Sequence, residues 1–128
     1  MAESAAAMRL YALRGAISVE RNEREQILGA TTALMSELME RNELTPEEMV
    51  SCLFTLTDDL NAEFPALAAR QMGLQSVPLL CAREVPVPGA LPRVIRALVH
   101  CYRPDGSSPR HVYLGDAAAL RTDLEAAQ

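Results

Sequence analysis

Residues 77–84, VPLLCARE, begin as an apolar, strand-like run and end in a thiol, a cation and a carboxylate. A loop rich in Pro and Gly follows over 85–90, and a second apolar run over 94–102 contains Arg96. A charge inside a core-like run requires a buried partner or a charged ligand. We therefore expect this segment to present Glu84 and Arg96, which either pair with each other at a strand end or bind an anion.

The second run is ambiguous between helix and strand by its periodicity. As a strand, 94–102 places Arg96 and His100 on one face, with Val94 and Leu98. The opposite face is then formed by Ile95, Ala97, Val99 and Cys101.

Upstream of this segment, helices and strands are expected to alternate. A strand is predicted over 8–13, ending at Arg14 beside a permissive Gly15. Asn22 and Glu25 resemble a capping box at the start of a helix over 23–41, whose apolar stripe would face the core.

Further elements are predicted before and after the central segment. Thr45 and Pro46 start a short helix, which is followed by a strand over 50–57 rich in β-forming residues. Pro65 starts a helix that Gly73 would end. Strands over 77–82, 94–102 and 110–114 come next, and 115–120 are expected to be helical.

This order predicts an α+β fold in which a mixed five-stranded sheet has helices packed on one face. The chain has 128 residues, of which 49% are hydrophobic and 4% aromatic, so we expect one domain over 1–128 with an aliphatic core. Residues 1–7 are expected to be a flexible extension, and about 121–128 a mobile, polar tail.

The charge and cysteine content exclude several classes of function. A net charge of −5 argues against nucleic-acid binding, which needs a cationic face. No apolar run reaches transmembrane length, and the first residues do not resemble a signal peptide. Three widely spaced cysteines and two histidines offer no zinc-ligand spacing, so we expect no metal site and a reducing, cytoplasmic location.

The sequence contains none of the common catalytic motifs, such as GxGxxG, a P-loop, GxSxG or HExxH. Cys81 and His111 could be proposed as a nucleophile and its base, but their spacing does not support the pair. What remains is a set of arginines at strand ends. All twelve basic residues are arginine, which suits the recognition of carboxylates but makes each single arginine less diagnostic.

Several short segments follow one another along the chain and together form a recognisable pattern. They are Leu13-Arg14-Gly15-Ala16, Val19-Glu20-Arg21, Phe64-Pro65-Ala66 with Arg70, Val77-Pro78 with Cys81 and Glu84, Gly89 with Ile95-Arg96, Arg110-His111-Val112-Tyr113-Leu114, and Leu120-Arg121 before Asp123-Leu124. Taken together, these segments resemble the monofunctional chorismate mutases of the AroH class. The resemblance extends from about residue 8 to about 125, in order and at compatible spacing.

The resemblance implies a homotrimer with a pseudo-barrel at its threefold axis and active sites between subunits. It also favours a strand over 94–102. The expected substrate is chorismate, which is rearranged to prephenate in phenylalanine and tyrosine biosynthesis without a cofactor, because the reaction occurs within one molecule.

The resemblance also implies roles for individual residues. Arg96 and Glu84 would be catalytic. The substrate would be bound by Arg14, Tyr113, Cys81, Arg70, Phe64, Leu120 and Arg121. One subunit would supply Phe64, Arg70, Cys81 and Glu84, and its neighbour Arg14, Arg96 and Tyr113. Leu67 departs from the family pattern, since some relatives have a lysine there. The alternative is a non-enzymatic trimer that holds a small anion on a similar scaffold.

Overall fold

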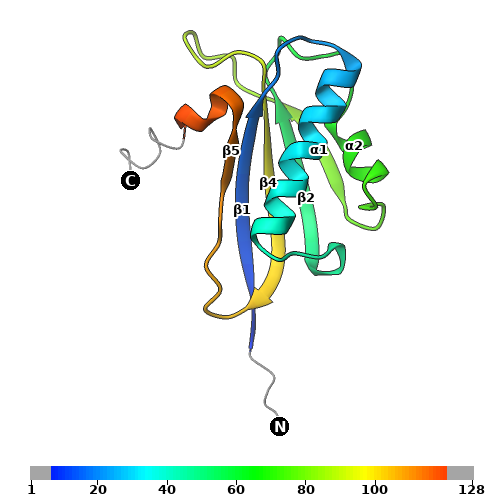
Figure 1. Ribbon diagram of the computed structural model, residues 1–128, viewed down its shortest axis with the longest axis vertical. Coiled ribbons are helices and arrows are strands. Elements are labelled where there is room, and N and C mark those ends of the chain that lie inside the picture. Colours follow the sequence, from blue (N-terminus) through cyan, green and yellow to red (C-terminus); the bar gives the residue numbers. More distant parts are fainter. Residues whose placement is uncertain (1–6, 121–128) are drawn as a thin grey trace.

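The computed structural model describes residues 7–120 of the chain, and within them five strands form one mixed sheet (Figure 1). The strands are β1 (Met8–Ser18), β2 (Met49–Leu56), β3 (Leu79–Arg83), β4 (Val94–Pro104) and β5 (Val112–Leu114). The helices are α1 (Arg24–Arg41) and α2 (Pro65–Gln71), with 3-10 turns η1 (Pro46–Glu48) and η2 (Gly115–Ala117). The predicted α+β class is confirmed, as is the five-stranded sheet.

The strand order is β3-β2-β4-β1-β5, which puts β4 in the middle of the sheet. β4 pairs antiparallel with both β1 and β2, while the edge strands β3 and β5 run parallel to β2 and β1. Because β4 has hydrogen-bonded neighbours on both sides, the ambiguous run is a strand. Its predicted faces are confirmed: Ile95, Ala97, Val99 and Cys101 are all buried, whereas Arg96, Leu98 and His100 are only partly buried.

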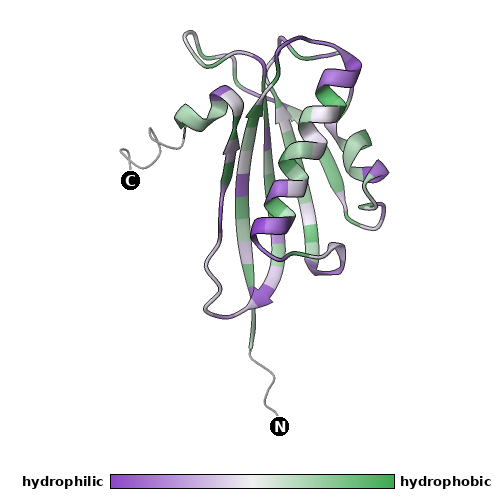
Figure 2. Cartoon of the chain, viewed as in Figure 1, coloured by the Kyte–Doolittle hydropathy of each residue, from purple (hydrophilic) through white to green (hydrophobic). Residues whose placement is uncertain are grey.

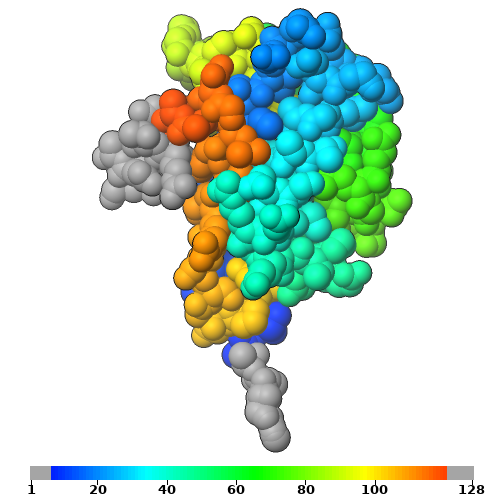
Figure 3. Space-filling view, in the orientation of Figure 1, coloured from blue at the N-terminus to red at the C-terminus, as the bar shows by residue number. Residues whose placement is uncertain are grey.

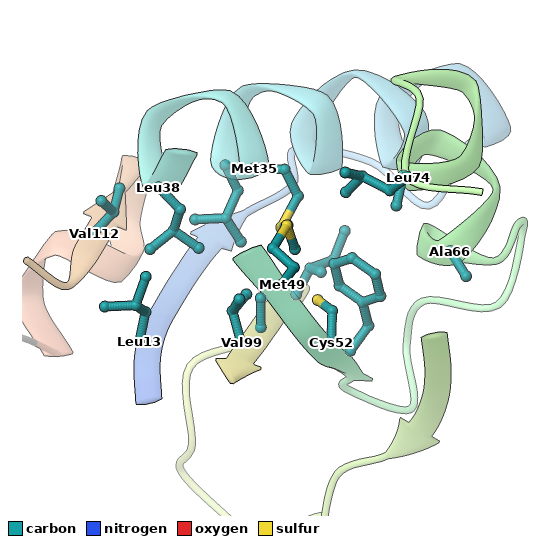
Figure 4. Packing of buried hydrophobic residues seen from close by; sticks show 14 of the residues in the cluster. Leu13, Met35, Leu38, Met49, Cys52, Ala66, Leu74, Val99 and Val112 are labelled. Carbon is teal, nitrogen blue, oxygen red and sulfur yellow. The ribbon is translucent and has the colours of Figure 1, made fainter. Parts of the chain in front are cut away.

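α1 and α2 cover one face of the sheet (Figures 1 and 3). The predicted helical stripe is confirmed, since Ile27, Thr31, Leu34 and Leu38 are fully buried. Figure 4 shows side chains of α1 meeting those of the strands in this core. Along the strands and α1, hydrophobic and hydrophilic residues alternate in bands (Figure 2), as expected for elements with one face in the core.

β1 is longer than the sequence predicts. The strand continues through Arg14 and Gly15 to Ser18, so Arg14 lies within the strand rather than at its end. The reason is that Gly15 pairs with Ala97 of β4 on one side and with Val112 of β5 on the other, which keeps the backbone extended.

The capping box expected at Asn22 and Glu25 is wrong. α1 begins after Glu23, which has extended backbone and makes no side-chain cap. The Asn22 side chain instead accepts hydrogen bonds from the backbone N–H groups of Asn61 and Ala62, both at 3.0 Å. A tertiary contact with the turn before α2 has replaced the local cap.

The other boundaries agree with the sequence to within a few residues. At η1, the Glu48 carboxylate accepts the Thr45 N–H at 2.9 Å, as predicted for a capped start. Gly73 follows α2 with a φ of +101°, the left-handed conformation that favours glycine after a helix. β3 and β5 are each shorter at their N-terminal ends than predicted.

We predict that Gly15→Ala lowers the free energy of unfolding by about 1–3 kcal/mol. A Cβ at this position would lie 2.9 Å from Cδ1 of both Leu34 and Leu38 and 3.2 Å from the Val112 carbonyl oxygen. Both leucines are fully buried, so their side chains would have to shift within a close-packed core. Urea unfolding measures the change.

The matched control is Gly29→Ala on α1, where an added Cβ meets nothing within 4 Å. This substitution should raise stability by roughly 0.5–1 kcal/mol, because alanine is the better helix former. Equal effects at the two glycines would contradict the close packing of α1 on β1.

Candidate active site

The face of the sheet opposite the helices carries a row of side chains from four strands. In the strand register, Thr55 of β2 lies opposite Arg96 of β4, Arg96 lies opposite Ala16 of β1, and Ala16 lies opposite Tyr113 of β5. We call this the open face. Ala16 is buried in a small cluster to which Tyr113 and Leu120 contribute.

The open face has a hollow of about 310 Å³, which is near the lower end of the size range of small-ligand sites. We call it the arginine hollow. It is lined by Arg14, Gly15, Leu53, Thr55, Arg96, Ala97, Leu98 and Tyr113. Two guanidinium groups and a phenol therefore converge on one surface, and no carboxylate is among these lining residues. Such a surface is suited to an anion with apolar parts.

Glu84 forms an ion pair with the Nε side of the Arg96 guanidinium. The Nε atom of Arg96 donates to Oε2 of Glu84 at 2.8 Å, and Oγ1 of Thr55 donates to the same oxygen, also at 2.8 Å. The pairing of Glu84 with an arginine, one of the two expected outcomes, is thus confirmed. Because Nε faces Glu84, the two terminal nitrogens of Arg96 are left to bind a ligand.

Arg96 is less buried than its position inside an apolar run suggested. The Arg96 side chain is 39% exposed in the single chain, whereas that of Glu84 is 16% exposed. The physical reason is strand alternation, which places the apolar neighbours of Arg96 in the core and Arg96 itself on the open face.

Arg14 is fixed through its backbone. Its N–H donates to Nδ1 of His111 at 3.0 Å, next to the start of β5. This hydrogen bond shows that His111 lies beside β1 and not near Cys81. Cys81 lies on β3 and His111 adjoins β5, and these strands are the opposite edges of the sheet. The nucleophile–base pair is therefore absent from this chain's geometry.

Phe64 and Cys81 line a second hollow of about 390 Å³, which we call the phenylalanine hollow. The other residues around it are Leu56, Leu60, Asn61, Ala62, Glu63, Ala82 and Arg83. Cys81 is in register with Phe54 of the core, so it lies toward the helix side of the sheet. Phe64 is 66% exposed at the start of α2.

Glu63 fixes the backbone at Phe64, a role that the sequence did not suggest. Its carboxylate accepts the Phe64 N–H at 2.9 Å and a hydrogen bond from Arg24 of α1 at 2.9 Å. The Phe64 N–H bond, followed by the Arg24 contact, lowers the pKa of Glu63 below its usual value. The turn that presents Phe64 is thereby tied to α1.

The structure thus divides the expected site residues into groups. Arg14, Arg96 and Tyr113 meet in the arginine hollow, with Glu84 beside it, while Phe64 and Cys81 meet in the phenylalanine hollow. Arg70 lies exposed on α2 and is not among the residues lining either hollow, and Arg121 lies outside the described residues. Thr55 and Glu63 were not identified from the sequence.

Within residues 7–120, no group of three or more His, Cys, Asp or Glu side chains is placed to hold a metal ion. The same residues contain no helix with the length and apolar character needed to cross a membrane.

Comparisons with known proteins identify the family of this chain. The family model described as chorismate mutase type I matches residues 10–124. The chain belongs to the type I chorismate mutase family.

Two relatives within this family are each named chorismate mutase AroH. The protein of Thermus thermophilus is 51% identical over 119 residues, covering 91% of this chain and 97% of the relative. The protein of Bacillus subtilis is 40% identical over 119 residues, covering 91% and 94%. A solved chorismate mutase from Clostridium thermocellum superimposes with a TM-score of 0.82 at 41% identity, covering 85% of this chain and 98% of that one.

The resemblance to this family suggested that Glu84 and Arg96 come from different subunits. Their ion pair at 2.8 Å instead brings them together within one chain. In this chain Glu84 therefore lies beside the arginine hollow, and the division of residues between subunits stays a prediction. The cause of the ion pair is the short loop over 85–93, which returns the chain from the end of β3 to the start of β4.

We predict that iodoacetamide at about pH 8 modifies Cys81 in the folded protein but not Cys52. Cys81 is partly exposed, whereas Cys52 is buried and its pKa is raised to about 12, mainly by burial and also by the nearby Cys81. Mass spectrometry of the modified peptides measures both rates.

Raising the pH to about 10 provides a control. A pKa of about 12 leaves Cys52 almost wholly protonated there, so its modification should still require unfolding. Rapid modification of Cys52 in the native protein would contradict its burial. Modification in denaturant should reach all three cysteines.

Proposed function

We propose that the protein converts chorismate to prephenate at sites shared between subunits of a homotrimer. Each site would combine the arginine hollow and Glu84 of one subunit with the phenylalanine hollow of its neighbour. The observation that carries this proposal is the convergence of Arg14, Arg96 and Tyr113 on one hollow in a chain of this family. Prephenate then leads to phenylalanine and tyrosine.

The reaction explains why the usual catalytic motifs are missing. Chorismate rearranges within one molecule, so that one carbon–oxygen bond breaks as one carbon–carbon bond forms. The reaction needs no nucleophile and no proton transfer. The protein has to hold an extended dianion in its compact, reactive shape and stabilise the charge that develops as the ether bond breaks.

Arg96 is the group best placed to stabilise that charge. Its Nε is held by Glu84, so the orientation of its terminal N–H groups is fixed before the substrate binds. Negative charge grows on the ether oxygen mainly in the transition state. A fixed cation at this point therefore binds the transition state more tightly than the substrate, which raises the turnover rate.

The other polar groups would hold the substrate. Arg14 and Tyr113 line the same hollow and can donate hydrogen bonds to the two carboxylates. Oε2 of Glu84 is occupied by Arg96 and Thr55, so Oε1 is the oxygen available to accept the substrate hydroxyl. Leu120, which packs near Tyr113, would border this half of the site.

The neighbouring subunit would supply the remaining residues. Phe64 offers an exposed apolar ring, and Cys81 a weakly polar thiol, in the phenylalanine hollow. Arg70 and Arg121 would add cations near the mouth of the site. Arg70 is exposed on α2, which leaves its side chain able to reach a second chain.

A trimer is supported by the two faces of the sheet. The arginine hollow lies on the open face and Cys81 lies toward the helix side, so one chain cannot bring the two together. Exposed apolar side chains of the open face include Met8, Leu10, Leu80 and Tyr102. Burial of such a surface against another copy is favourable. The cytoplasmic location stays a prediction.

We predict that purified protein consumes chorismate, measured by the loss of its ultraviolet absorbance together with the formation of prephenate. In the same assay, replacing Arg96 with citrulline should reduce kcat strongly while changing KM much less. Citrulline keeps the shape and most hydrogen bonds of arginine but not its charge. Loss of one preorganised donor costs on the order of 3 kcal/mol, about a hundredfold in rate.

Two results would contradict this proposal. If the protein bound chorismate without consuming it, the anion-binding alternative would be the correct one. If the citrulline variant kept its kcat while its KM rose sharply, Arg96 would be a substrate anchor rather than the catalytic cation.

We predict that two inactive variants regain activity when their subunits are mixed, provided the changes lie in opposite halves of the shared site. Arg96→Ala damages the arginine hollow, and Phe64→Asp places a carboxylate where the dianion would bind. Random mixing leaves both halves intact at about one interface in four. Co-refolded mixtures should therefore recover about a quarter of the wild-type activity.

Arg96→Ala mixed with Arg14→Ala is the matched control, because both changes lie in the arginine hollow. This mixture should stay inactive. Recovery in both mixtures, or in neither, would show that the site is not shared between subunits in the proposed way.

A further inference from the structure

Thr55 of β2 contacts Glu84, the partner of Arg96, although it lies in none of the short segments on which the sequence resemblance rested. Its Oγ1 donates to Oε2 of Glu84 at 2.8 Å, the oxygen that also accepts from Nε of Arg96 at 2.8 Å. A carboxylate oxygen can accept two hydrogen bonds, so this oxygen is fully used. Glu84 is thereby held from two directions, by β2 and by β4.

The position of Thr55 follows from the sheet. Thr55 is opposite Arg96 in the antiparallel register of β2 and β4, so both side chains point to the open face. Glu84 follows β3, and its backbone N–H donates to the Leu56 carbonyl at 2.9 Å, which continues the ladder with β2. The Glu84 carboxylate therefore lies directly over Thr55.

Glu84 has particular need of such a contact. It is the last residue before the loop over 85–93, in which Val85 is 79% exposed. Without a second contact, rotation of the Glu84 side chain could exchange its two oxygens and release Nε of Arg96. A hydrogen bond from a β-branched threonine, whose own side chain is stiff, removes this freedom.

We propose that Thr55 is a positioning residue that fixes Oε2 of Glu84 and, through it, the guanidinium of Arg96. It leaves Oε1 to face the substrate hydroxyl and directs the terminal nitrogens of Arg96 toward the ether oxygen. This inference rests on the proposed function for its kinetic test. Thr55 acts through Glu84 and Arg96 and does not itself take part in the chemical step.

The test compares Thr55→Val, which keeps the shape but loses the hydroxyl, with Thr55→Ser, which keeps the hydroxyl. Thr55→Val should lower kcat about tenfold or more, since hydrogen bonds to charged groups are worth roughly that factor. KM should change less than about threefold. Thr55→Ser should recover most of the lost activity.

Ser51→Ala is the matched control. Ser51 lies on the same strand and shares a hydrogen bond of 3.1 Å with Nδ1 of His100 on β4, but it does not contact Glu84. Ser51→Ala removes a cross-strand hydroxyl contact comparable to the one lost in Thr55→Val. A general loss of sheet stability would therefore affect both of these variants. We expect Ser51→Ala to keep wild-type kcat.

A double-mutant cycle separates positioning from a structural role. In a Glu84→Ala background, measured with enzyme in excess over chorismate, Thr55→Val should have no further effect on the rate. Thermal unfolding of every variant confirms that the folded state is populated.

Three results would overturn the proposal: wild-type kcat in Thr55→Val, a Thr55→Ser variant as slow as Thr55→Val, or an additive loss in the double mutant. These results all require an active wild-type protein. An inactive wild type would instead contradict the proposed function, so the two failures are distinguishable.

Discussion

The structure depends on the two-sided constraint placed on β4. This strand is the middle of the sheet, so its backbone must pair on both sides while its two faces meet different surroundings. One face packs under α1 and α2, and the other carries Arg96. Because side chains alternate strictly along a strand, a shift of one residue would place Arg96 in the core and either Ile95 or Ala97 at the site. Register and catalysis are therefore specified by the same pattern.

Much of the fold could be predicted from the sequence, because its local signals agree with one another. The apolar stripe of α1 and the run of β-forming residues in β2 each indicate one element, and the order of elements then leads to the α+β class. The predicted element boundaries that were wrong are those determined by contacts between residues far apart in the sequence. Asn22 has a capping side chain, but the turn at Asn61 and Ala62 binds it more effectively. Gly15 suggests the end of a strand, but its pairing with β4 on one side and β5 on the other continues β1 to Ser18.

The site was predictable to a smaller extent, and for a physical reason. Resemblance to a family indicates which residues matter, but it does not state which atoms meet. Glu84 and Arg96 are twelve residues apart, and the resemblance assigned them to different subunits. The loop between them instead lets their side chains form an ion pair within one chain. Thr55 carries no signal in the sequence, since a threonine in a strand is an ordinary β-former. Its role emerges only from the register of β2 with β4.

The same ion pair links assembly to chemistry. In the single chain the Arg96 side chain is 39% exposed, and an ion pair at this level of exposure contributes about 0–1 kcal/mol. A second subunit covering the open face would remove water from the pair. Burying a lone guanidinium would be costly, but Glu84 already accepts from the Nε of Arg96, and Thr55 donates to the same Glu84 oxygen, which lowers that cost. In the proposed trimer the terminal nitrogens would then act on the substrate in a medium that screens charge less than water does. The proposed interface would therefore convert a weak surface pair into a fixed and effective cation.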